Sequence, residues 1–130
     1  YAIARPETID QLTKVKDSYN CDALSLAAAT AAIDDQAWLR DNVAKIRASR
    51  KSLTERVRAM GFTVIDSQAN FVWCTHPTKP LKPMYEHLKS GGILVRYMPY
   101  PGWGEGLRIS VGTEQQLEVC LMLLAEALKR

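Results

Sequence analysis

The feature that most constrains the fold is a single apolar stripe in residues 35–60. Its members are spaced by 4, 3, 7, 4 and 3 positions: Leu39, Val43, Ile46, Leu53, Val57 and Met60. This spacing predicts one long helix with one buried face, and Arg50 fills the stripe position that the gap of seven leaves open. The opposite face is mostly charged, which is typical of a solvated surface, and Gly61 is a typical helix end. A helix of this kind needs a second layer that covers its stripe.

The residues after Gly61 supply that second layer. Four β-prone runs are expected to be strands, at 62–65, 71–74, 93–96 and 107–111. A helix is predicted between Pro80 and Gly91, and another after the capping-box pair Thr113 and Gln116. The Gly- and Pro-rich segment 97–106 is predicted to be a loop. The order of elements favours an α+β two-layer sandwich, with helices packed on one face of a small, mostly antiparallel sheet.

We expect the chain to consist of an N-terminal extension, residues 1–34, and a domain, residues 35–130. Pro6 is typical of a first helical turn, and the Ala- and Leu-rich run 23–33 predicts a helix with Asp22 as its N-cap. Because its side chains are small all round, this helix is expected to pack closely on another surface.

Composition excludes several classes of protein. The chain has 130 residues, 47% of them hydrophobic, which is ordinary for a globular domain, and its net charge of +3 is too weak to indicate a nucleic-acid partner. The longest uncharged runs, 23–33 and 67–78, are too short to span a membrane as a helix. The chain shows no signal-peptide pattern. It does not start with Met, so we expect a piece of a longer protein, here called the parent.

The cysteines and histidines indicate no metal site and no disulfide framework. Cys21, Cys74 and Cys120 are far apart and form no Cys-x-x-Cys, so we expect reduced thiols, buried or half-buried, in a cytoplasmic protein. His76 and His87 have no carboxylate at a recognisable metal-ligand spacing.

Two arginines are the strongest candidates for a binding site. Arg96 ends the third expected strand and Arg108 lies near the start of the fourth, so a hairpin-like return would bring both to one edge of the sheet. Two planar guanidinium groups at one rim suit a carboxylate or a phosphate, although two ordinary surface ion pairs would give the same pattern.

The other candidates are weaker. Asn70, before a strand, could orient a ligand or cap a turn, and Tyr19 in a polar bend could line a cleft or belong to a simple turn. Tyr97, Tyr100 and Trp103 could stack on a flat ligand or fold their segment onto the domain. No catalytic residue is predicted, because no nucleophile or base has a recognisable partner.

Four motifs resemble the histidinol-phosphate aminotransferases, in the order of that family: Tyr19–Ser25, Gln68–Trp73, Gly92–Tyr97 and Gly106–Thr113. The last motif is shared by many class I/II aminotransferases, and Cys21 stands where the family usually has Val. The resemblance implies the C-terminal third of a cytoplasmic, homodimeric fold-type I enzyme of histidine biosynthesis. That enzyme depends on pyridoxal phosphate and acts on histidinol phosphate and glutamate or 2-oxoglutarate.

The resemblance also implies which residues matter here. Arg108 matches the arginine that holds the acidic group of the substrate, Arg96 matches a second arginine at the substrate rim, and Asn70 and Tyr19 match positions near the cleft. The Schiff-base lysine and the cofactor pocket would lie upstream of this chain, so the chain alone is expected to bind no cofactor and to be inactive. Residues 1–34 would belong to the large-domain side of the parent.

Two alternatives stay open at this point. The chain could be the small domain of another class I/II aminotransferase or of a related decarboxylase that acts on phosphate substrates. It could instead be a free-standing α+β module that binds a small ligand or a nucleic acid, although few aromatic residues lie on its expected strands.

Overall fold

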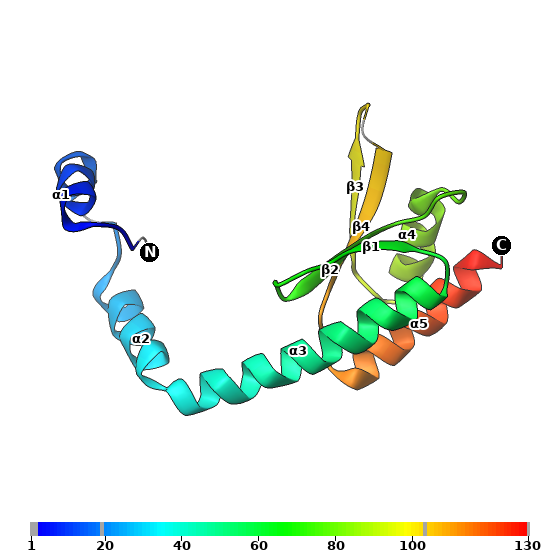
Figure 1. The fold of residues 1–130 in the computed structure, drawn as a ribbon, viewed down its shortest axis with the longest axis horizontal. Helices are drawn as coiled ribbons and strands as arrows, with labels where there is room; N and C mark the ends of the chain where they lie inside the picture. The colour runs from blue at the N-terminus through cyan, green and yellow to red at the C-terminus, as the bar shows by residue number, and fades with distance from the viewer. Residues whose placement is uncertain (1–2, 19, 103, 130) are drawn as a thin grey trace. The chain divides into compact units, whose positions relative to one another are not determined.

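The chain divides into two compact units, residues 1–39 and 40–130 (Figure 1). The computed structural model describes residues 3–18, 20–102 and 104–129. The first unit contains α1 (Pro6–Val15) and α2 (Ala23–Asp34), and α3 (Gln36–Ala59) begins in it and continues into the second. Asp22 caps α2 as predicted, because its side chain accepts a hydrogen bond from the Ser25 N–H at 2.9 Å. No described residue of 3–18 and 20–39 is buried.

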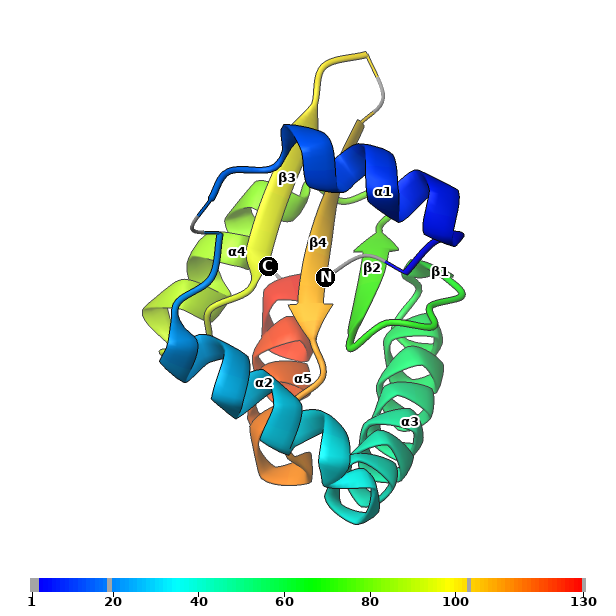
Figure 2. The ribbon, with the colours of Figure 1, turned by 90° about the vertical axis from the view of Figure 1, so that its left-hand side faces the viewer.

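The second unit is built on a four-stranded sheet in the order β1-β2-β4-β3. Its strands are β1 (Thr63–Ile65), β2 (Phe71–Thr75), β3 (Arg96–Tyr100) and β4 (Gly104–Ser110), and every neighbouring pair is antiparallel. Two further helices, α4 (Leu81–Ser90) and α5 (Glu114–Leu128), lie behind β3 and β4 in the view of Figure 2. Thr113 and Gln116 form the predicted capping box at the start of α5.

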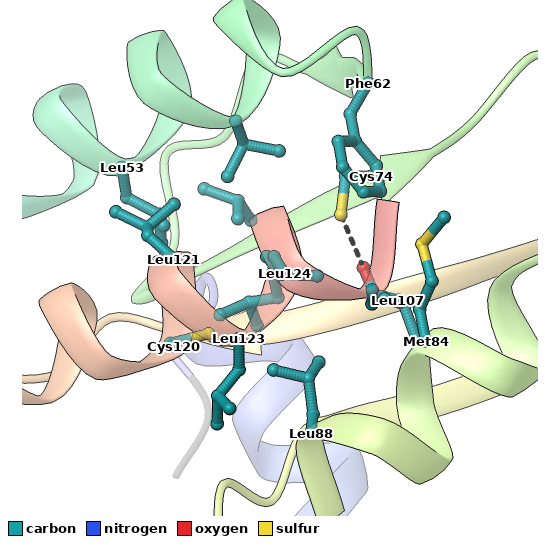
Figure 3. Close-up of a cluster of buried hydrophobic side chains, with 14 of the residues drawn as sticks. Leu53, Phe62, Cys74, Met84, Leu88, Leu107, Cys120, Leu121, Leu123 and Leu124 are labelled. Carbon is teal, nitrogen blue, oxygen red and sulfur yellow. Dashed lines mark hydrogen bonds between the residues drawn. The ribbon is translucent and has the colours of Figure 1, made fainter. Parts of the chain in front are cut away.

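The core fills the space between this sheet and the three helices (Figure 3). Val72, Cys74, Leu107 and Ile109 enter it from the two central strands. The helices contribute side chains that are also almost completely buried: Leu53, Val57, Leu81, Met84, Leu88, Leu117, Cys120, Leu121, Leu123, Leu124 and Ala127. All these helical residues face one side of the sheet, which confirms the predicted two-layer α+β sandwich.

The long helix α3 begins and ends within one residue of the predicted range 35–60. Only part of its apolar stripe is buried. Leu53 and Val57 are fully buried, whereas Leu39 remains 41% exposed. The buried part of the stripe is therefore the C-terminal part of α3, next to the sheet. Among the described residues, no helix is sufficiently long and apolar to cross a membrane.

The predicted strand at 93–96 and the predicted loop at 97–106 are both wrong. The strand β3 starts only at Arg96, and β3 and β4 form a β-hairpin whose register pairs Arg96 with Arg108 and Tyr100 with Gly104. Residues 93–95 instead connect α4 to β3, with Leu94 79% exposed. The loop was predicted because this segment contains prolines. Pro99 is compatible with a strand here because β3 is an edge strand, where a missing N–H is tolerated.

The three thiols have different environments. Cys74 and Cys120 lie in the core, and burial raises their pKa to about 12 and about 11, respectively. The Cys74 thiol also lies 3.6 Å from the Leu107 carbonyl oxygen that accepts its hydrogen bond (Figure 3). Cys21 is exposed, so the expectation of a buried or half-buried thiol is wrong for this residue.

We expect a maleimide reagent at neutral pH to modify Cys21 well before Cys74 and Cys120. The reacting species is the thiolate, and the raised pKa values keep the two core thiols protonated while packing blocks access. Mass spectrometry of peptides after timed labelling measures the order. A Cys21→Ser variant should take up reagent only when denaturant is added, and native labelling of Cys74 at the rate of Cys21 would contradict the buried position.

Candidate anion-binding face of the sheet

The face of the sheet opposite the helices carries the two predicted arginines. Leu107 and Ile109 point into the core, so Arg108 between them points to the opposite face. Arg96 is its direct partner on β3, and Trp73 is its direct partner on β2. Directly paired residues of antiparallel strands share a face, so the structure brings Arg96 and Arg108 side by side, as the sequence predicted.

Arg108 lies in an unusual environment for an arginine. Its Nε atom is buried and has no hydrogen-bond partner among the described residues, and its guanidinium carbon lies 5.2 Å from the centre of the Phe71 ring. Like charges directly opposite each other destabilise a sheet, and a buried donor without a partner is costly. An anionic group placed between the two guanidinium groups would relieve both penalties.

A hollow of about 300 Å³ adjoins this arginine, and it is lined by Phe71, Trp73, Met98, Tyr100 and Arg108. The rings of Trp73 and Tyr100 are 5.9 Å apart and tilted by 50°. The hollow therefore offers one guanidinium group beside apolar and aromatic walls, an arrangement typical of small-molecule sites.

The aromatic residues of the hairpin have separate roles. Tyr100 lines the hollow, as a stacking role would require. Tyr97 is on the helix side and stacks on Tyr85 of α4, with ring centres 5.9 Å apart. Trp103 lies outside the described residues. Trp73 was not predicted as a wall of the site. The alternation of Phe71, Trp73 and Thr75 with buried Val72 and Cys74 is a signal for the face on which Trp73 lies, but not for its place beside Arg108.

Asn70 directly precedes β2, so it lies at the end of that strand and not beside the two arginines. Its carbonyl oxygen accepts a hydrogen bond from the Val111 N–H at 2.8 Å, and its side chain is exposed. Arg50 of α3 holds the preceding turn, because it donates to the Ala69 carbonyl at 2.7 Å. Asn70 precedes Trp73 by three residues, or roughly 10 Å along the strand. Tyr19 lies outside the described residues.

Comparison with known proteins identifies the family of the chain. Residues 1–124 match the family described as aminotransferase class I and II. The chain belongs to this family. A histidinol-phosphate aminotransferase from Rhodopirellula baltica is 51% identical over 129 residues, which is 99% of this chain and 36% of that protein. The chain thus spans little more than a third of the length of this relative.

Two solved structures have the same fold. The histidinol-phosphate aminotransferase from Sinorhizobium meliloti, in complex with pyridoxal-5'-phosphate, superposes with a TM-score of 0.81 at 24% identity over 95% of this chain and 34% of that one. A decarboxylase from Sulfurospirillum multivorans gives a TM-score of 0.75 at 22% identity over 94% of this chain and 36% of that one. These likenesses establish the aminotransferase small-domain fold.

The cofactor of the family, pyridoxal phosphate, does not fit the face described here. Its attachment requires a lysine, and none of the strands β1, β2, β3 and β4 contains one. Lys14 lies at the end of α1, where its Nζ donates to the Gln11 side chain, and Lys16 donates to the Asp17 carbonyl. The arginine face therefore suits an anionic group and not the covalent site of the cofactor.

Proposed function

We propose that the chain is the C-terminal part of a histidinol-phosphate aminotransferase and that Arg108 and Arg96 hold an anionic group of its substrate. The observation that carries the proposal is the cross-strand pair of arginines, one of which has a buried Nε without a partner among the described residues. The relative from Rhodopirellula baltica, 51% identical across nearly the whole chain, supports the choice of substrate.

In this function the chain supplies substrate orientation. Arg108 offers a rigid fork of donors that can bind a carboxylate or a phosphate through two parallel hydrogen bonds. Arg96 adds a second positive charge at the same height of the sheet. Trp73 and Tyr100 line the hollow beside Arg108 and can exclude water from the bound group. Asn70 and Tyr19 are proposed as further substrate-binding residues of the parent.

The proposal extends to the parent. Residues 1–34 would pack on its remaining part, which agrees with an exposed fraction of 83% for Leu24 on α2. Residues 35–130 would form the small domain. We propose a cytoplasmic homodimer that uses pyridoxal phosphate, held by residues outside this chain, and glutamate or 2-oxoglutarate as the second substrate.

Substrate profiling of the parent tests the function. We expect the highest kcat/KM for transfer of the amino group from histidinol phosphate to 2-oxoglutarate, measured against a panel of other amino donors. The isolated chain is the control and should not transaminate. A higher kcat/KM for a different amino donor would indicate another class I/II aminotransferase. Release of CO₂ from an amino acid would favour the second candidate, a decarboxylase, which the shared fold with the Sulfurospirillum multivorans enzyme supports.

A further inference from the structure

The helix side of the β3–β4 hairpin contains a polar contact that the substrate face does not explain. Tyr97 directly follows Arg96 and pairs with the core residue Leu107, so it points to the helices. Glu105 precedes Leu107 by two positions and therefore faces the same side. A phenol and a carboxylate thus lie directly behind the strand that carries Arg96.

Both oxygens of the Glu105 carboxylate accept hydrogen bonds. The Tyr97 hydroxyl donates to Oε2 at 2.5 Å, and the Leu81 N–H donates to Oε1 at 2.5 Å. Leu81 is the first residue of α4, and the N-cap position before it is Pro80, which has no side-chain cap. Glu105 therefore caps α4 from 24 positions away in the sequence, and a negative charge is favourable at a helix N-terminus.

A ring contact of Tyr97 also joins the hairpin to α4. The Tyr97 ring stacks on Tyr85 of α4 with an angle of 26° between the ring planes. The hydrogen bond to Glu105, together with burial, raises the pKa of the Tyr97 phenol above its ordinary value, so the hydroxyl stays a donor at neutral pH. The hydrogen bond and the ring stack together fix the position of β3 relative to the first turns of α4.

This attachment matters because β3 is an edge strand. Among the described strands its one neighbour in the sheet is β4, and Pro99 within β3 has no N–H to donate. Edge strands paired on one side open more readily than central ones, because fewer hydrogen bonds hold them. Without a second attachment, the position of Arg96 would depend on the β4 ladder alone.

We propose that Glu105, with the Tyr97 hydroxyl and the Leu81 N–H, forms a hairpin clamp that positions Arg96 for the substrate. Glu105 and Tyr97 are positioning residues, because they act through β3 and do not touch the substrate face. The inference rests on the proposed function for the role of Arg96, but the clamp itself is a property of the fold that can be tested separately.

Amide hydrogen exchange of the 130-residue chain tests the clamp. Glu105→Gln and Tyr97→Phe should speed exchange at residues 96–98, 100 and 104–108 about five- to tenfold, the effect of losing one hydrogen bond. Tyr85→Phe removes a hydroxyl but keeps the ring that stacks on Tyr97. Glu126→Gln removes a carboxylate paired with His87 at 3.2 Å. These two controls should leave hairpin exchange unchanged. Unchanged exchange in both clamp variants would overturn the proposal.

Kinetics of the parent test the positioning role. Glu105→Gln should raise KM for histidinol phosphate about three- to tenfold, the range of a lost hydrogen bond, with a smaller change in kcat. In an Arg96→Ala background the same substitution should have no further effect on KM, because the group that it positions is absent. Additive losses would refute action through Arg96. If the parent does not use histidinol phosphate at all, the proposed function fails, and the exchange experiment still decides on the clamp.

Discussion

Replacement of Arg108 by alanine in the parent is expected to lower kcat/KM for histidinol phosphate about ten- to 150-fold. A hydrogen bond to a charged group contributes about 1.5–3 kcal/mol, and this arginine has a buried Nε without a partner among the described residues. Lysine keeps the charge and loses the fork of donors, so Arg108→Lys should recover only part of the loss. Steady-state kinetics of both half-reactions, with a melting curve for each variant, provide the measurement.

A matched control for this experiment is Arg47→Ala, which removes an exposed arginine of α3. We expect this variant to keep the kcat/KM of the parent. Because Arg108 points away from the core, its alanine variant should remain folded. A folded Arg108→Ala variant with near-normal kcat/KM would show that Arg108 does not anchor the substrate.

Local sequence signals were sufficient for the helices. The apolar spacing predicted α3 as residues 35–60, and the structure has Gln36–Ala59. Asp22 and Thr113 were recognised as N-caps, because a cap is a contact between residues three positions apart. These features depend only on residues that are close in the sequence, so they can be recognised in a single sequence.

The third strand could not be located in the same way. Residues 93–96 have the better β-prone pattern, but the strand forms at Arg96–Tyr100, where β4 supplies partners. Which run becomes a strand is decided by pairing across the hairpin and by the contact of Glu105 with α4. Such contacts between distant residues override local propensity.

The candidate site was predicted in part for the same reason. The return of the chain between Arg96 and Arg108 follows from their spacing, so their proximity could be predicted. Trp73 could not be linked to them, because the register that pairs it with Arg108 joins residues 35 positions apart. Of the two glycines of β4, Gly104 and Gly106, one has a packing role that only the structure reveals.

That glycine is Gly106, which lies directly beneath the Trp73 ring. A Cβ atom at this position would lie 1.9 Å from Trp73 Cζ2 and 2.4 Å from Cε2 and Cη2. Such distances are far below van der Waals contact, and the indole would have to move. The Tyr100 ring, with its centre 5.9 Å from that of Trp73, restricts this movement on one side.

We therefore expect Gly106→Ala to lower the free energy of unfolding of the chain by about 1–3 kcal/mol, the range for overpacking at a well-packed site. Urea unfolding followed by circular dichroism measures the loss. Trp73→Leu supplies the control in a double-mutant cycle: with the indole absent, the added methyl group has room, so Gly106→Ala should cost markedly less in that background. Equal costs in the two backgrounds, or a loss within about 0.5 kcal/mol of zero, would contradict the close packing of Trp73 on Gly106.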